Sequence, residues 1–117
     1  MNNPPSKNHK DLIKVLNKIG FLVETEVWVS RYSLDCYVED LHAGFEADTK
    51  KTHMKGRDRK RDKWIWENYN IPILRVDIEE YKDMDTLKKK ILDFVNKYEG
   101  TAGERRGNFI SSSEGIE

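Results

Sequence analysis

"LDCYVEDLHAGFEADTKKTHMKGRDRKRDKW", residues Leu34–Trp64, combines two β-like segments with a dense run of lysines and arginines. The segments "SLDCYV" (33–38) and "GFEADT" (44–49) alternate apolar and polar residues, which is typical of half-buried strands. The polar link "EDLHA" between them can form a turn. We therefore expect an antiparallel hairpin here.

The register of this hairpin decides where its acidic residues lie. If paired residues have numbers that sum to 83, the turn lies around Leu41 and Asp35 faces Asp48. Side chains of paired residues project to the same side of a sheet, so Asp35, Glu46 and Asp48 would form one acidic patch. Four residues would pack behind this patch: Leu34, Cys36, Phe45 and Ala47.

An acidic patch of this kind favours a metal site. Opposed carboxylates repel one another, so a positive charge is expected between them. Mg²⁺ and similar hard cations bind carboxylate, carbonyl and water oxygens. His53 lies five residues beyond Asp48, where a loop could bring it over the patch as a general base or proton donor. The alternative is that the acids form the solvated side of a half-exposed sheet, with an inert loop histidine.

The basic run suggests a second kind of surface. The whole chain has a formal net charge of zero, but residues 49–63 contain eight lysines and arginines against two aspartates, a local charge of +6. Such a surplus predicts a phosphate-binding surface, and the alternative is a solvated helix face. The eight residues are Lys50, Lys51, Lys55, Arg57, Arg59, Lys60, Arg61 and Lys63.

The remaining sequence predicts three helices and two more strands. Apolar spacing indicates helices over 8–19, 57–69 and 84–98, and β-rich composition indicates strands over 21–29 and 71–76. Within 21–29, one side of the strand should carry Phe21, Val23, Thr25, Val27 and Val29. In the second helix, Asp58, Asp62, Ile65 and Tyr69 fall on one stripe. The order α-β-β-β-α-β-α predicts an α/β fold, a small mixed sheet with flanking helices.

Length and composition limit the remaining possibilities. A chain of 117 residues suits one domain, which we place at 8–98, between a flexible lead-in (1–7) and a Gly- and Ser-rich mobile tail (99–117). The single cysteine, Cys36, excludes an intramolecular disulfide and any multi-cysteine zinc site. No apolar run has the length of a membrane span, so we expect a cytoplasmic, intracellular protein without membrane contact.

Taken in order, these features resemble the PD-(D/E)xK nuclease superfamily between Asp11 and Arg75. The resemblance is greatest to the branch that contains the very-short-patch repair endonucleases and the homing endonucleases with an EDxHD pattern. Its parts are Asp11 on the first helix, Asp35 on the second strand, "FEAD", His53, the helix start "DRKR" and the closing strand "IPILRV". Asp48 stands where the standard motif has a lysine, and the very-short-patch branch also lacks that lysine.

The resemblance implies a restriction-endonuclease-like core and an Mg²⁺- or Mn²⁺-dependent DNA endonuclease or nickase. It implies that Asp35 and the Ala47 carbonyl bind the metal. Glu46, Asp48 and Asp11 match further acidic positions of the family. His53 would activate water or stabilise the scissile phosphate. Asp58 would orient His53.

Two other functions stay open at this point. One is a non-catalytic nucleic-acid-binding protein on the same fold, and the other is a partner protein whose acids are only surface residues. If the chain is an enzyme, cleavage of both DNA strands would need a homodimer or two successive cuts. A phage or mobile-element origin would suit so short a chain, and mismatch repair would not, because the cysteines of the repair enzymes' structural zinc site are missing.

Overall fold

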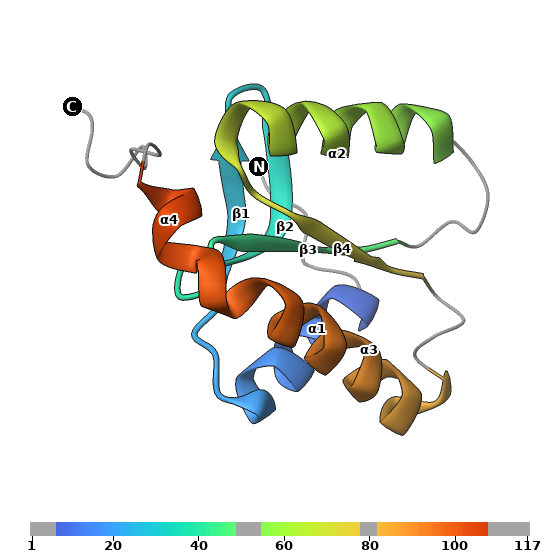
Figure 1. The fold of residues 1–117 in the computed structure, drawn as a ribbon. Coiled ribbons are helices and arrows are strands. Elements are labelled where there is room, and N and C mark those ends of the chain that lie inside the picture. The colour runs from blue at the N-terminus through green and yellow to red at the C-terminus, as the bar shows by residue number, and fades with distance from the viewer. Residues whose placement is uncertain (1–6, 49–54, 78–81, 108–117) are drawn as a thin grey trace.

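A computed structural model describes residues 7–48, 55–77 and 82–107. Its core is a four-stranded sheet in the order β1-β2-β3-β4, in which β1, β2 and β3 pair antiparallel and β3 pairs parallel with β4. The predicted α/β fold with a mixed sheet is confirmed (Figure 1). The elements are α1 (Lys7–Ile19), β1 (Glu24–Val29), β2 (Tyr32–Val38), β3 (Ala43–Ala47), α2 (Lys55–Tyr69), β4 (Ile73–Val76), α3 (Met84–Tyr98), η2 (Glu99–Thr101) and α4 (Ala102–Arg106).

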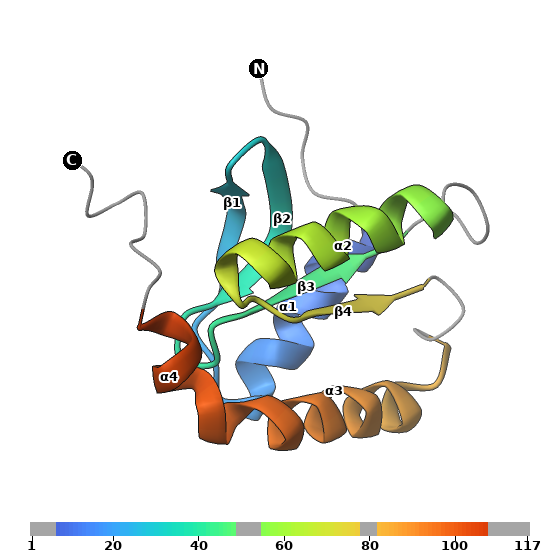
Figure 2. The same ribbon diagram turned by 45° about the horizontal axis from the view of Figure 1, so that its top comes forward.

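Helices cover both faces of the sheet. The helix α2 lies over one face, and α1 and α3 lie over the other (Figures 1 and 2). The apolar core is accordingly split into two clusters. Leu12, Leu16 and Phe45 belong to the cluster on the side of α1 and α3, whereas Leu34 and Ile65 belong to the cluster under α2. Burial of each such side chain contributes about 1.5–3 kcal/mol, so both layers hold the sheet in place.

The alternation of β1 and β2 is interrupted where Glu26 lies opposite Asp35. The recorded pairs on either side are Thr25 with Cys36 and Val27 with Leu34, and Glu26 between them has a left-handed φ of 53°. A residue in this conformation twists the strand and shifts which face the next side chains occupy.

This interruption corrects two predictions. Val27 and Val29 pack under α2, but Phe21 and Val23 pack on the opposite layer, so they do not share one side. Leu34 likewise lies under α2, in a different cluster from three residues predicted to pack with it: Cys36, Phe45 and Ala47.

Two helices end at left-handed residues. Gly20, the predicted terminator of α1, has a φ of 121° and its N–H donates to the Leu16 carbonyl at 3.2 Å. At the end of α2, Asn70 has a φ of 59° and donates to the Trp66 carbonyl at 2.9 Å. Glycine and asparagine are the residues that most readily adopt this conformation after a helix. These ends fix where β1 and β4 begin.

The first part of the predicted mobile tail is helical. Residues 99–106 form η2 and α4, and Ala102 and Arg105 are buried. The Arg105 guanidinium donates to four backbone carbonyl oxygens, those of Leu41, His42, Asn70 and Tyr98, at 2.7, 2.7, 3.2 and 2.7 Å. Tyr98 ends α3 and Asn70 follows α2, so this cation also complements the negative ends of two helix dipoles. The remaining tail, 108–117, lies outside the described residues.

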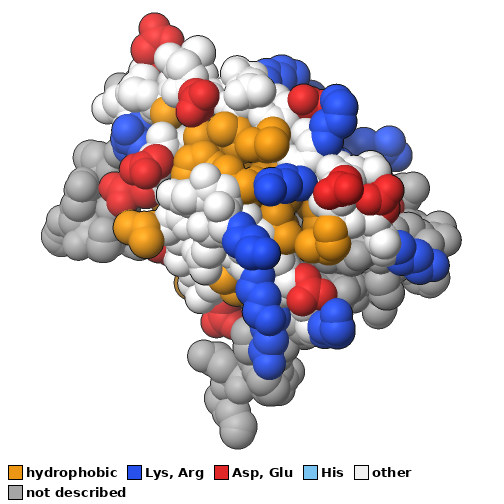
Figure 3. All heavy atoms as spheres, turned by 90° about the horizontal axis from the view of Figure 1, so that it is seen from below, with side chains coloured by type: hydrophobic (Ala, Val, Ile, Leu, Met, Phe, Trp, Pro, Cys, Tyr) orange, Lys and Arg blue, Asp and Glu red, His pale blue; other side chains and the backbone are white. Residues whose placement is uncertain are grey.

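The face formed by α1 and α3 combines apolar side chains with lysines (Figure 3). Met84 and Leu92 of α3 are 47% and 37% exposed there. A cavity of about 250 Å³ is lined by Val15, Lys18, Met84, Asp85 and Lys88. Within the described parts of the chain, no helix has both the length and the apolar character needed to cross a membrane.

Candidate active site at the fork between β2 and β3

The hairpin register differs from the predicted one by two residues. Cys36 pairs with Phe45 and Val38 with Ala43, so paired numbers sum to 81. This places Asp35 opposite Glu46 rather than Asp48. The turn therefore lies over residues 39–42, one residue earlier than expected, and His42 in it adopts a φ of 48° and buries its side chain.

Two hydrogen bonds hold the His42 ring. Its Nδ1 lies 2.8 Å from the Tyr37 hydroxyl, and its Nε2 lies 2.9 Å from the Tyr69 carbonyl oxygen. Because a carbonyl can only accept, Nε2 carries the proton and Nδ1 accepts from the tyrosine. Burial lowers the pKa of His42, which favours this neutral form. A histidine without an assigned role in the sequence therefore fixes the hairpin register.

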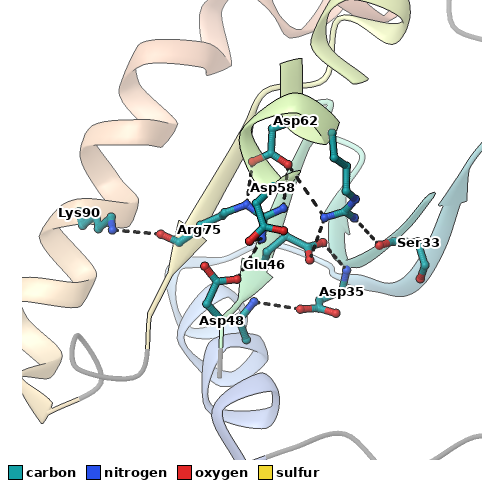
Figure 4. Close-up of polar contacts among 10 residues, drawn as sticks. Ser33, Asp35, Glu46, Asp48, Asp58, Asp62, Arg75 and Lys90 are labelled. Atoms are coloured by element: carbon teal, nitrogen blue, oxygen red, sulfur yellow. Dashed lines mark hydrogen bonds and ion pairs between the residues drawn. The ribbon is translucent and has the colours of Figure 1, made fainter. Parts of the chain in front are cut away.

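Regular pairing of β2 with β3 stops at Cys36 and Phe45, and two carboxylates continue the connection. The Asp35 N–H donates to Glu46 Oε2 at 2.8 Å, and the Ala47 N–H donates to Asp35 Oδ2 at 2.9 Å (Figure 4). From α1, the His9 Nε2 lies 3.0 Å from the Asp35 carbonyl oxygen. We call the Asp35–Glu46 pair and the Ala47 backbone the fork.

Glu46 is the electrostatically strained member of the fork. Its side chain is buried, and burial, followed by the nearby charge of Asp35, raises its pKa to about 7. The Arg61 guanidinium opposes this shift, but its Nη1 is 3.5 Å from Glu46 Oε1. Arg75 opposes the shift more weakly, so the pKa of Glu46 stays raised and the fork has an excess of negative charge when both carboxylates are ionised.

A second group of acids surrounds Arg75 of β4. The Arg75 Nε and Nη2 donate to the two oxygens of Asp62 at 2.7 and 2.8 Å. Its Nη1 lies 3.0 Å from Asp48 Oδ1 and 3.6 Å from Asp58 Oδ2 (Figure 4). Asp58 and Asp62 lie on the predicted stripe of α2, which faces the sheet. We call these four residues the arginine cluster, and in it a guanidinium supplies the positive charge that the sequence suggested a metal would supply.

Among the described residues, the predicted metal ligands do not all lie together. Within 7–48, 55–77 and 82–107, no three His, Cys, Asp or Glu side chains are grouped closely enough to hold a metal. The donors at the fork are nevertheless suited to Mg²⁺, which is commonly bound through one or two carboxylates with water and substrate phosphates completing its shell. Asp35 uses only Oδ2 in its contact with Ala47, and no contact of Oδ1 is present among the described residues. Asp48 suits this role less, because it binds Arg75.

The other predicted acids are not part of the fork. Asp11 binds Lys7 at 2.8 Å on the surface of α1. Asp58, predicted to orient His53, contacts Arg75. His53 itself lies outside the described residues.

The predicted phosphate-binding residues divide between two sides of α2. Arg57, Arg59, Lys60 and Lys63 are exposed, and Lys63 is 3.6 Å from Glu67. Arg61 instead points inward. Lys50 and Lys51 are outside the described residues, as is the side chain of Lys55.

Arg61 joins α2 to the fork, a role the sequence analysis did not assign to it. Its Nη2 donates to the Ser33 carbonyl at 2.6 Å, besides the contact with Glu46. The signal was its position four residues before the buried Ile65, which places both on one helix face. For Arg75, the signal was a charged residue inside the apolar run "IPILRV".

Comparisons with known proteins identify the fold. No protein-family model matches the chain, and no curated protein sequence matches it. Among solved structures, the catalytic domain of the homing endonuclease I-Bth0305I is similar, with a TM-score of 0.62 and 16% sequence identity. The similarity covers 77% of this chain and 94% of that domain. The chain therefore has the fold of a homing endonuclease catalytic domain, in agreement with the predicted nuclease-like core, and the very-short-patch branch stays a prediction.

Proposed function

We propose that this protein is a metal-dependent DNA endonuclease or nickase. The observation that carries the proposal is the fork, where Asp35 and Glu46 of adjacent strands meet and Glu46 has one contact with an arginine, Arg61, at 3.5 Å. The similarity to a homing endonuclease catalytic domain supports the same function. That similarity makes DNA the expected substrate.

In this proposal, Asp35, Glu46 and the Ala47 carbonyl would hold Mg²⁺ or Mn²⁺. The bound ion would polarise the scissile phosphate and lower the pKa of a water molecule. His53 is proposed to accept or donate a proton during hydrolysis. The interlocked hydrogen bonds of the fork keep the two carboxylates in fixed positions, which is the requirement for a site that acts without reorganising.

The arginine cluster has a supporting role in the proposal. Asp48 and Asp58 hold Arg75 and thereby attach β4 and α2 to β3 beside the fork. Asp11 takes no part in the chemistry, because its carboxylate is paired with Lys7. The exposed bases of α2, with Lys50 and Lys51, are proposed to bind backbone phosphates without reading sequence.

A second candidate function is a non-catalytic nucleic-acid-binding protein of the same fold. One observation favours it: the described residues bring no three metal-binding side chains together, and Arg75 contacts two of the candidate acids, Asp48 and Asp58. In that case the fork would be only a structural connection between β2 and β3.

Nicking of supercoiled plasmid distinguishes the two candidates. The first predicts relaxed product with Mg²⁺, none with EDTA, and none with Asp35→Ala in Mg²⁺. The second predicts salt-sensitive DNA binding with no relaxed product under any of these conditions. Equal nicking by wild type and Asp35→Ala would reject the fork as the active site.

A further inference from the structure

The tip of the β1–β2 hairpin carries an exposed tryptophan that the fold does not use. Trp28 is 61% exposed, although tryptophan is usually well buried. It pairs with Ser33, whereas the next pair, Val29 and Tyr32, packs against the layer under α2. Because neighbouring residues of a strand point to opposite faces, Trp28 projects from the face away from α2.

The tip is held firmly against the rest of the molecule. The Tyr32 ring lies edge-on to Trp64 of α2, with centroids 5.5 Å apart. The Arg31 guanidinium lies over the Tyr32 ring at 5.3 Å, and that of Arg61 lies over the same ring at 5.6 Å. Since Arg61 also contacts Glu46, the tip and the fork share a side chain, and their relative position is fixed.

The distance along β2 between the tip of the hairpin and the fork suits a ligand that contacts both. Ser33, the partner of Trp28, precedes Asp35 by two residues, which is about 7 Å along an extended strand. One strand of duplex DNA advances about 7 Å in two base steps. Glu46 faces α2 and Trp28 projects from the opposite face, so a nucleic acid bound at the fork would reach Trp28 by passing around the tip of the hairpin.

The positive charge at the tip of the hairpin also suits a nucleic acid. Arg31 is exposed, and among the described residues it contacts the Tyr32 side chain and no carboxylate. On this tip, Trp28 provides a stacking surface, and Arg31, over the Tyr32 ring that packs under α2, provides a phosphate contact. A second copy of the chain is a poorer occupant of this edge strand, because Glu24 and the left-handed Glu26 interrupt edge-to-edge pairing.

We infer that Trp28 and Arg31 form a second DNA contact, in which Trp28 stacks on a base or sugar and Arg31 binds a phosphate. The inference rests on the proposed function, because it takes DNA as the ligand. It adds the tip of the β1–β2 hairpin to the DNA-binding surface, with Trp28 on the face of the sheet opposite α2 and Arg31 over the Tyr32 ring, which packs under α2.

Binding without cleavage tests the inference. A labelled 20-base-pair duplex is titrated in EDTA and followed by anisotropy at several salt concentrations, and tryptophan emission is followed with unlabelled duplex. Trp28→Ala should weaken binding by about fivefold or more and remove most of the quenching of emission. Arg31→Gln should reduce the magnitude of the salt slope by about one.

Matched controls separate this contact from general effects. Leu22→Ala removes a side chain that is 86% exposed elsewhere and should leave affinity unchanged. Trp66→Phe removes another partly exposed tryptophan and should leave the quenching in place. Thermal melts should show that all four variants remain folded.

Three results would overturn the inference: wild-type affinity in Trp28→Ala, no binding of duplex by the wild type, or a dimer in sedimentation that Trp28→Ala dissociates. The last result would assign the tip to a second copy of the chain. Because the titration contains no metal, the inference can fail while Asp35-dependent nicking persists. It can also hold when nicking is absent.

Discussion

The fork and the arginine cluster contain the same residue types on adjacent elements, yet their charges are balanced differently. In the arginine cluster, one guanidinium contacts Asp48, Asp58 and Asp62, and the Asp62 contact is bidentate. In the fork, Glu46 has one contact with Arg61, at 3.5 Å, and its pKa is raised to about 7, while Asp35 accepts from the Ala47 N–H.

The difference indicates how acids that hold a fold together can be told from acids available for chemistry. A carboxylate with its own close, hydrogen-bonded arginine has little tendency to bind another cation. A buried carboxylate beside a second one gains from a cation or a proton. The two regions therefore differ in how closely their acids are paired with an arginine, more than in the number of acids they contain.

The largest expected effect on stability comes from Arg75→Ala. This change leaves three acids without their common cation, in a region where the side chains of Arg75 and Asp62 are 19% and 23% exposed. We expect a loss of about 3 kcal/mol in the free energy of unfolding, measured by urea denaturation. Lys63→Ala, which removes an exposed pair with Glu67, is the control and should cost less than about 0.5 kcal/mol. A small loss of stability in both variants would contradict a structural role for the arginine cluster.

At the fork, Glu46→Gln should increase the free energy of unfolding, whereas Arg75→Ala decreases it. The pKa of Glu46 is about 7 in the folded protein against 4.5 ordinarily, so its contribution to stability is greatest below pH 4.5 and is lost as the pH rises through 7. Removing the charge should therefore stabilise the protein by about 2 kcal/mol at pH 8 and by much less at pH 5. Urea denaturation at the two pH values measures this. Destabilisation at pH 8 would mean that Arg61 fully compensates Glu46.

The outer side of α2 offers a third environment, basic and exposed, for comparison with both acidic regions. Replacing Arg59, Lys60 and Lys63 together by Gln should weaken DNA binding evenly across sequences. Each lost phosphate contact should reduce the magnitude of the salt slope by about one. Anisotropy titrations between low and moderate salt measure the slope. An unchanged slope would place the DNA on another face.

The smallest effect is expected from Asp11→Ala. The family pattern implies a role for this acid in the site, but its pair with the 85% exposed Lys7 resembles an ordinary surface ion pair. The free energy of unfolding should change by less than about 0.5 kcal/mol, and plasmid nicking should stay near the wild-type rate. A strong loss of nicking with unchanged stability would place Asp11 in the chemistry after all.

The elements were predictable from sequence because their signals are local. Apolar spacing located α1, α2 and α3, and Gly20 marked the end of α1. The register of the hairpin was not predictable, because it depends on a left-handed, buried His42 whose partners are Tyr37 and Tyr69. A two-residue change keeps each side chain on its face, so the pattern alone allows either register.

Long-range contacts also explain the other differences. Arg105 is one residue in a Gly-rich segment, and only its four carbonyl partners from distant parts of the chain show that it is buried. The split of the acids between the fork and the arginine cluster likewise depends on β4 lying parallel to β3, which brings Arg75 beside Asp48. Asp35 was correctly placed on β2 beside β3, but its partner, Glu46 and not Asp48, required the structure.

The most direct test compares one acid from each region in the same assay. Asp35→Asn and Asp62→Asn are assayed for nicking of supercoiled plasmid with Mg²⁺, at a temperature where melts show both variants folded. The fork as active site predicts that Asp35→Asn abolishes nicking while retaining stability, and that Asp62→Asn loses stability while the folded fraction still nicks. Nicking that survives in Asp35→Asn, or that is lost only in folded Asp62→Asn, would contradict the assignment of chemistry to the fork and of structure to the arginine cluster.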